Sequence, residues 1–145
     1  MKLGIFIQNR FSDWVLDLSY VFGLSSKFTG MTIGILVFIR TGITGKALEE
    51  LKNHERIHII QYFEVTAIFM VLFTSLSLWL HLHQLIPLLS FLMYYVIYIK
   101  NFLLLRVKSN SLFAYRRILF EKEAYDNDTN PNYLQERKII AWINA

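Results

Sequence analysis

One short run of the sequence combines residues that can do chemistry: His54-Glu55-Arg56-Ile57-His58. Residues four apart share one face of an α-helix, so the imidazoles of His54 and His58 can reach the same metal ion. Glu55 lies about 100° around the helix, beside such an ion, where it can take a proton from a water molecule that the metal activates. We therefore predict a zinc site with these histidines as ligands and Glu55 as general base. Two exposed histidines on a surface helix are the alternative.

A catalytic zinc site usually has three protein ligands and one open position. At about 1.5 Å per residue, His81 and His83 lie on the order of 35 Å beyond His58 on a continuous helix, so neither can complete the site. Glu121 and Glu123 are the candidates further along the chain, because a carboxylate completes a two-histidine zinc site well. Either can reach the histidines only if the chain folds back in between.

The distribution of basic residues indicates such a return. All fifteen Lys and Arg lie outside residues 57–99; seven precede this window and eight follow it. The apolar runs 57–80 and 85–107 are each long enough to cross a hydrocarbon core of about 30 Å. Segment 81–87 is polar and ends in a helix-breaking proline. We predict two antiparallel membrane-spanning helices joined by a tight turn, which brings the segment after residue 107 back to the level of His58.

Composition and charge favour a membrane location. Charged residues make up only 18% of the chain, against about 25% in an average soluble domain. The positive-inside rule then places both termini and the metal site in the cytoplasm, because the turn has no Lys or Arg. The first apolar stretch is too short for a secretory signal. The alternative is a helical hairpin in the core of a soluble protein, although so short a chain offers little polar surface to cover such a core.

Composition also excludes several classes of protein. The high apolar content excludes intrinsic disorder. The absence of Cys excludes a disulfide scaffold, a thiolate zinc site, an iron–sulfur site and a cysteine nucleophile. The basic residues are scattered and no stacking motif accompanies them, so we expect no nucleic-acid partner. The net charge of +4 is better suited to the anionic headgroups of a lipid bilayer.

Further elements are expected on both sides of the apolar runs. Segment 30–40 is β-branched and aromatic, which predicts a strand or a hairpin just before the histidine helix, and Thr44 can cap that helix. The other predicted helices are a short amphipathic one over 13–22, one over 111–125, and a last one from Pro131 to about Trp142. The fold class is therefore mainly α: one domain over residues 1–145, with a two-span helical membrane hairpin and a small α+β cytoplasmic portion.

The two motifs together resemble a known family. His54–His58, followed later by Phe120-Glu-Lys-Glu-Ala-Tyr125, is similar to the H-E-x-x-H and E-x-x-A pattern of gluzincins, a group of zinc metallopeptidases. The longer run 54–61 also resembles small, uncharacterised bacterial membrane proteins. The resemblance implies a zincin-like fold, a bacterial inner-membrane location and Glu121 as third zinc ligand, with Ala124 at the small position. Glu123 remains the competing choice.

The chain departs from the family at Tyr125. The family usually has an Asp after the Ala of E-x-x-A, where it orients a ligand histidine. Asp126 or Asp128 can take that place. By analogy with the family, segment 31–39 is expected to supply the edge strand that holds an extended peptide. The developing oxyanion also needs a donor, and the sequence leaves several open: Tyr115, Arg116, Arg117, Tyr125 and Tyr133.

Other polar residues near the motifs have less specific expectations. Gln61 lies on the same side of the helix as His54, so it can bond a ligand carboxylate or the substrate, or lie at the headgroup boundary. The structural alternative for Glu121 is a helical ion pair with Arg117. Glu123 is expected to be a solvated charge.

These expectations combine into one function. We predict a membrane-embedded zinc-dependent hydrolase, a metallopeptidase, that acts on a peptide or a membrane protein near the bilayer. The alternative is a non-catalytic zinc-binding membrane protein, such as a sensor or an interaction subunit. The sequence leaves the substrate and the oligomeric state open.

Overall fold

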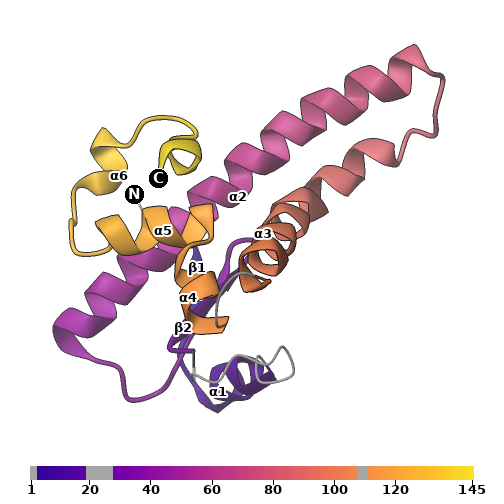
Figure 1. Ribbon diagram of the computed structural model, residues 1–145. Helices are drawn as coiled ribbons and strands as arrows, with labels where there is room; N and C mark the ends of the chain where they lie inside the picture. The colour runs from indigo at the N-terminus through magenta and orange to yellow at the C-terminus, as the bar shows by residue number, and fades with distance from the viewer. Residues whose placement is uncertain (1–2, 19–27, 108–110) are drawn as a thin grey trace.

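The computed structural model describes residues 3–18, 28–107 and 111–145. The architecture is mainly helical, with one small sheet (Figure 1). The elements in chain order are β1 (Ile5–Ile7), α1 (Arg10–Asp17), β2 (Gly30–Ile33), β3 (Leu36–Ile39), α2 (Gly45–Trp79), the 3₁₀ helix η2 (Ile86–Leu89), α3 (Ser90–Arg106), α4 (Ser111–Arg116), α5 (Leu119–Asn127), α6 (Tyr133–Glu136) and the 3₁₀ helix η3 (Ala141–Asn144).

The sheet lies between α1 and the first part of α2. Its central strand β3 pairs in parallel with β1 and antiparallel with β2, so β2 is an edge strand. On β3, Phe38 packs against α1, whereas Val37 and Ile39 pack against Ile59 of α2. The hairpin predicted over residues 30–40 is confirmed. Strand β1 was not predicted, because three residues are too few to show a period.

Helix α1 begins earlier than the predicted amphipathic helix over residues 13–22. Asn9 caps it by accepting a hydrogen bond from the backbone N–H of Ser12, and the Ser12 hydroxyl accepts one from the backbone N–H of Asn9. Residues 19–22 of the predicted helix lie outside the described residues. Helix α1 covers β3 and so holds the sheet in place behind α2.

Helices α2 and α3 lie side by side and project away from the rest of the molecule (Figure 1). Helix α2 begins after Thr44, as predicted, although the Thr44 side chain makes no capping bond. The helices Gly45–Trp79 and Ile86–Arg106 are both long and apolar enough to cross a membrane. The two helices expose large apolar side chains along their length, which include Val71, Leu72, Leu78, Trp79, Leu92, Val96, Leu103 and Leu104.

The chain after α3 is more broken than predicted. The helix predicted over 111–125 is two helices, α4 and α5, because the buried residue Ile118 has an extended backbone between them. This break lets Ile118 and Phe120 join one core cluster with Val65 and Tyr94 of the two long helices. Helix α5 therefore packs against α2, where Glu121 faces the histidine motif.

The single last helix predicted from Pro131 to about Trp142 is also wrong. Helix α6 ends at Glu136, and the backbone of Arg137 is extended. The left-handed residue Ile140 then reverses the chain into η3. The physical reason is the side chain of Arg137, which is buried between the carboxylates of Glu64 and Glu123. The backbone leaves the helix after Glu136 and places this side chain against both of them. Figure 1 shows this C-terminal segment beside α2 and α5.

Candidate metal centre

Helices α2 and α5 bring His54, His58 and Glu121 together. All three are buried, and their potential ligand atoms lie within 4.8 Å of one another. The two histidine Nε2 atoms are 3.1 Å apart. Glu121 Oε2 lies 3.3 Å from His54 Nε2, and Oε1 lies 3.4 Å from His58 Nε2. Two imidazole nitrogens and one carboxylate thus converge on a point where a metal ion can bind.

The state of Glu121 fits a metal ion. Its Oε2 atom is buried and has no hydrogen-bond partner among the residues that the structure describes. Tyr98 donates a hydrogen bond of 2.6 Å to the other oxygen, Oε1. Burial by itself raises the pKa of Glu121, but the adjacent His58 and His54 outweigh burial and hold this pKa well below its usual range. The carboxylate is therefore ionised beside the two histidines, and a metal ion would take the place of the histidine protons.

The two histidines are oriented by further partners. Gln61 Oε1 lies 2.8 Å from His58 Nδ1, and the Tyr94 hydroxyl lies 3.3 Å from the same atom. Asp128 Oδ2 lies 3.5 Å from His54 Nδ1. Both imidazoles thereby turn their Nε2 atoms toward Glu121. Of the roles that the sequence left open for Gln61, a bond to Glu121 is not among its hydrogen bonds in the described part of the chain: it bonds His58 and the carboxylate of Glu123.

In gluzincins an Asp after the E-x-x-A motif orients a ligand histidine. In this chain two residues, Asp128 and Tyr125, contact His54. Asp128 contacts His54, as the sequence left open, whereas Asp126 pairs with Lys122 at the surface. Tyr125 packs its ring edge-on against the His54 ring, with 4.6 Å between centroids. The departure at Tyr125 therefore leaves His54 with both a carboxylate and an aromatic contact.

We call His54, His58 and Glu121 the candidate metal group. Glu55 is buried beside this group and faces the edge strand β2. Thr32 donates a hydrogen bond of 2.6 Å to Glu55 Oε2. A Cβ atom on Gly30 would lie 2.5 Å from Glu55 Oε1, so glycine leaves the room that this carboxylate occupies. The edge strand expected within 31–39 is β2, since β3 is central. Strand β2 thus sets the position of the residue predicted as general base.

A small pocket opens next to His54 and Glu55. Its volume is about 210 Å³, enough for a side chain or a few water molecules. It is lined in part by Phe28, Gly30, Glu50, Tyr115, Tyr125 and Asp128. Two of the predicted oxyanion donors therefore face it, whereas Tyr133 bonds Glu123 instead. Burial raises the pKa of Tyr125 to about 12, so its hydroxyl keeps its proton and can donate.

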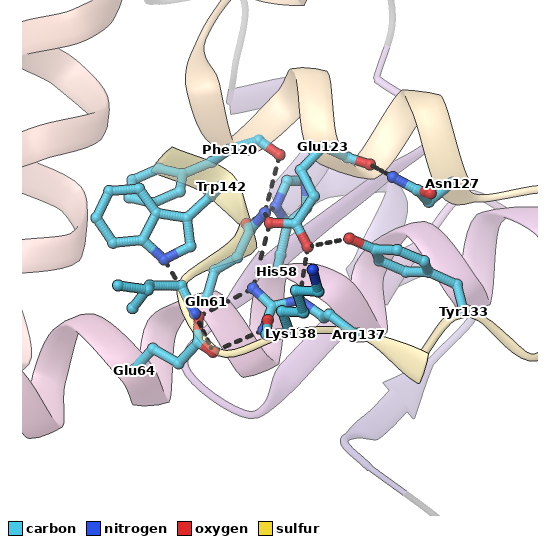
Figure 2. Close-up of polar contacts among 11 residues, drawn as sticks. His58, Gln61, Glu64, Phe120, Glu123, Asn127, Tyr133, Arg137, Lys138 and Trp142 are labelled. Atoms are coloured by element: carbon cyan, nitrogen blue, oxygen red, sulfur yellow. Dashed lines mark hydrogen bonds and ion pairs between the residues drawn. The ribbon is translucent and has the colours of Figure 1, made fainter. Parts of the chain in front are cut away.

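The expectation for Glu123 is wrong. Glu123 is buried, not solvated, and accepts hydrogen bonds from Gln61, Tyr133 and Arg137 (Figure 2). Arg117 precedes the break before α5, so Arg117 and Glu121 do not lie on one continuous helix.

The sequence reasoning missed Arg137 entirely. The available signal was the isolated Glu64 in a long apolar run, since a buried carboxylate needs a cation. Arg137 is that cation, with bonds to Glu64 of 2.6 and 2.9 Å. Burial lowers the pKa of Arg137, but its bonds to Glu64 and Glu123 outweigh burial and raise it, so the guanidinium is charged.

Comparison of the chain with family models, with curated proteins and with solved structures found no match. The buried group of His54, His58 and Glu121 therefore stands on its own geometry as a site that can hold a metal ion. The resemblance to gluzincins is carried by the two motifs alone.

Proposed function

We propose that this protein is a membrane-embedded zinc-dependent hydrolase, and specifically a metallopeptidase. The observation that carries the proposal is the convergence of two buried imidazoles and one buried carboxylate, with Glu55 alongside them. Three protein ligands with a base nearby are typical of catalytic zinc sites, which keep a fourth position open. The Oε2 atom of Glu121 supports this, because it is buried, faces His54 Nε2 at 3.3 Å and makes no hydrogen bond within the described part of the chain, which is costly unless a ligand satisfies it.

Each residue has a chemical task in this proposal. Zinc would supply Lewis-acid chemistry, which activates a water molecule and polarises a carbonyl group. Glu55 accepts the proton of the attacking water and returns it to the leaving amine. Thr32 holds the Glu55 carboxylate in place during both steps. Tyr115 and Tyr125, which face the pocket, can donate to the developing oxyanion.

The proposed location follows from the two long helices. Their projecting halves expose apolar side chains, which suits a hydrocarbon environment better than water. All Lys and Arg lie before residue 57 or after residue 99, so the positive-inside rule places both termini and the metal site at the cytoplasmic side. A peptide segment at or near the bilayer surface is then the substrate that can reach the pocket.

The proposal is tested with the full chain purified in detergent. We expect about one zinc ion per chain by elemental analysis, and its loss in His54→Ala and Glu121→Ala. Glu55→Gln should keep the zinc ion but lose cleavage of a library of quenched fluorescent peptides. Lys122→Ala serves as the control, because Lys122 lies on α5 beside Glu121 but is exposed. Cleavage by Glu55→Gln at the wild-type rate would show that the cleavage does not depend on this site, and would refute the proposed hydrolase.

One observation favours a second function, that of a zinc-binding sensor or interaction subunit without catalysis. The three ligand residues are only 2–6% exposed, and the pocket beside them is small. Closed zinc sites are usually structural. This function predicts zinc in the wild type and in Glu55→Gln, and no cleavage of any peptide by either protein.

A further inference from the structure

A second buried polar cluster lies next to the metal group, around Arg137 of the C-terminal segment (Figure 2). The Arg137 side chain is 3% exposed. Its guanidinium makes two bonds to Glu64 on α2, of 2.6 and 2.9 Å, and also bonds both oxygens of Glu123 on α5. One cation thus joins the helix that carries both histidines to the helix that carries Glu121.

The remaining acceptor sites of both carboxylates are filled by the same segment. Tyr133 donates to Glu123, while the backbone N–H of Ile140 and the indole N–H of Trp142 donate to Glu64. Arginine suits this place because its planar guanidinium makes two bonds to each of the two carboxylates, whereas a lysine ammonium has only three donors. The cluster is therefore complete without any added ion.

Gln61 connects this cluster to the metal group. Its Nε2 donates to Phe120 O and to Glu123 Oε2, at 3.0 Å each. Both of these atoms only accept, so the amide has one orientation, with Oε1 toward His58. His58 Nδ1, at 2.8 Å, must then donate its proton to Gln61 Oε1. This tautomer leaves the Nε2 of His58 free to bind a metal ion.

We propose that Arg137 acts as a positioning residue for the metal site, by fixing Glu123, Gln61 and hence the tautomer and ring orientation of His58. The C-terminal segment 133–144 then belongs to the working site, although it supplies no ligand. This inference rests on the metal-binding function proposed above, which it deepens.

The first test measures metal binding by the full chain in detergent, with Co²⁺ as probe through its visible absorption. Loss of a partner that orients a metal ligand typically weakens metal binding by about 10- to 100-fold. We expect a loss of this size, with a changed cobalt spectrum, in Gln61→Met and Arg137→Ala, and a smaller loss in Arg137→Lys. The matched control is Lys138→Ala, which removes the neighbouring positive charge from an exposed side chain and should bind Co²⁺ as the wild type does.

The second test reads the tautomer of His58 directly, without metal. Nitrogen NMR of ¹⁵N-histidine-labelled protein should show His58 protonated at Nδ1 in the wild type and a mixture of tautomers in Gln61→Met and Arg137→Lys. If Arg137→Ala does not fold alone, added propylguanidinium, which replaces the missing fork, should restore both folding and cobalt binding.

The outcomes separate the two proposals. A wild type that binds Co²⁺, together with Gln61→Met and Arg137→Lys variants that have wild-type affinity, spectrum and tautomer, overturns the positioning role alone. A wild type that binds neither Co²⁺ nor Zn²⁺ overturns the metal-site function and this inference with it.

Discussion

Two buried acidic residues on the same helix, Glu121 and Glu123, have opposite surroundings. Glu123 is held by Arg137, Tyr133 and Gln61, so its charge is compensated within the chain. Glu121 faces two histidines, and one of its oxygens has no hydrogen-bond partner among the described residues. Similar side chains two positions apart thus form one closed ionic cluster and one cluster that is suited to accept an ion. The contrast indicates that Glu123 has a structural role, whereas Glu121 is suited to bind a metal ion.

The strongest test of this contrast compares alanine at the two positions. Glu121→Ala removes one of three ligands, and we expect zinc affinity to fall by at least about a thousandfold while the apo protein stays folded. Glu123→Ala should weaken zinc binding much less, by about 10- to 100-fold, because Gln61 loses one of the partners that orient it. It should also destabilise the fold, because it leaves Arg137 half paired. Zinc content and thermal unfolding of both variants measure this. The reverse result, in which zinc is lost only in Glu123→Ala, would show that Glu123 and not Glu121 is the third ligand.

The second test concerns the closed cluster. Arg137→Ala leaves Glu64 and Glu123 buried without a cation, which should lower the free energy of unfolding by about 3–5 kcal/mol. Chemical denaturation in detergent measures the change. Lys46→Ala is the comparison, because Lys46 is 90% exposed in its pair with Glu50, and its removal should change stability little. Equal effects of the two variants would mean that burial does not distinguish these ion pairs.

The third test uses the metal itself. An ion that binds only the folded state at a concentration about 100 times its Kd should stabilise the protein by about 2.7 kcal/mol. Addition of Zn²⁺ to the metal-free wild type should therefore raise the thermal midpoint, and a chelator should reverse the rise. His58→Ala should show no rise. A rise of equal size in His58→Ala would place the zinc ion elsewhere on the chain.

The smallest expected effect concerns Glu55, the proposed general base. In Gly30→Ala the added Cβ meets Glu55 Oε1 at 2.5 Å, so the carboxylate must shift. Misplacement of a catalytic group by about 1 Å costs up to about 100-fold in rate. We expect peptide cleavage to fall by about 10- to 100-fold at unchanged zinc content. Gly42→Ala is the comparison for a Cβ added in open space, because nothing lies within 4 Å of it; unlike Gly30, Gly42 has a positive φ, so this variant also shows the cost of backbone strain alone.

Regular helix geometry explains what the sequence could predict. The spacing of His54 and His58 places both rings on one face of α2, and a turn after Trp79 returns the chain, so Glu121 on α5 meets them. The β-branched segment before Thr44 likewise predicted the hairpin of β2 and β3. These features depend on periodicity or on the length of an apolar run, which a single sequence displays.

The missed features depend on partners that are far apart in the sequence. Arg137 and Glu64 are 73 residues apart, and no local pattern connects them. The break at Ile118 and the end of α6 at Glu136 exist because they bring Phe120 and Arg137 into buried positions. In each case tertiary packing overrides a local sequence that favours a longer helix.

The distance in sequence between Glu64 and Arg137 also has a consequence for synthesis. If α2 enters a bilayer as proposed, the ribosome delivers the carboxylate of Glu64 well before the guanidinium that neutralises it, because Arg137 follows Glu64 by 73 residues. Until Arg137 has been synthesised, Glu64 must remain hydrated or protonated. The packing of α2 around Glu64 would then be completed late, only after Arg137 has reached its position.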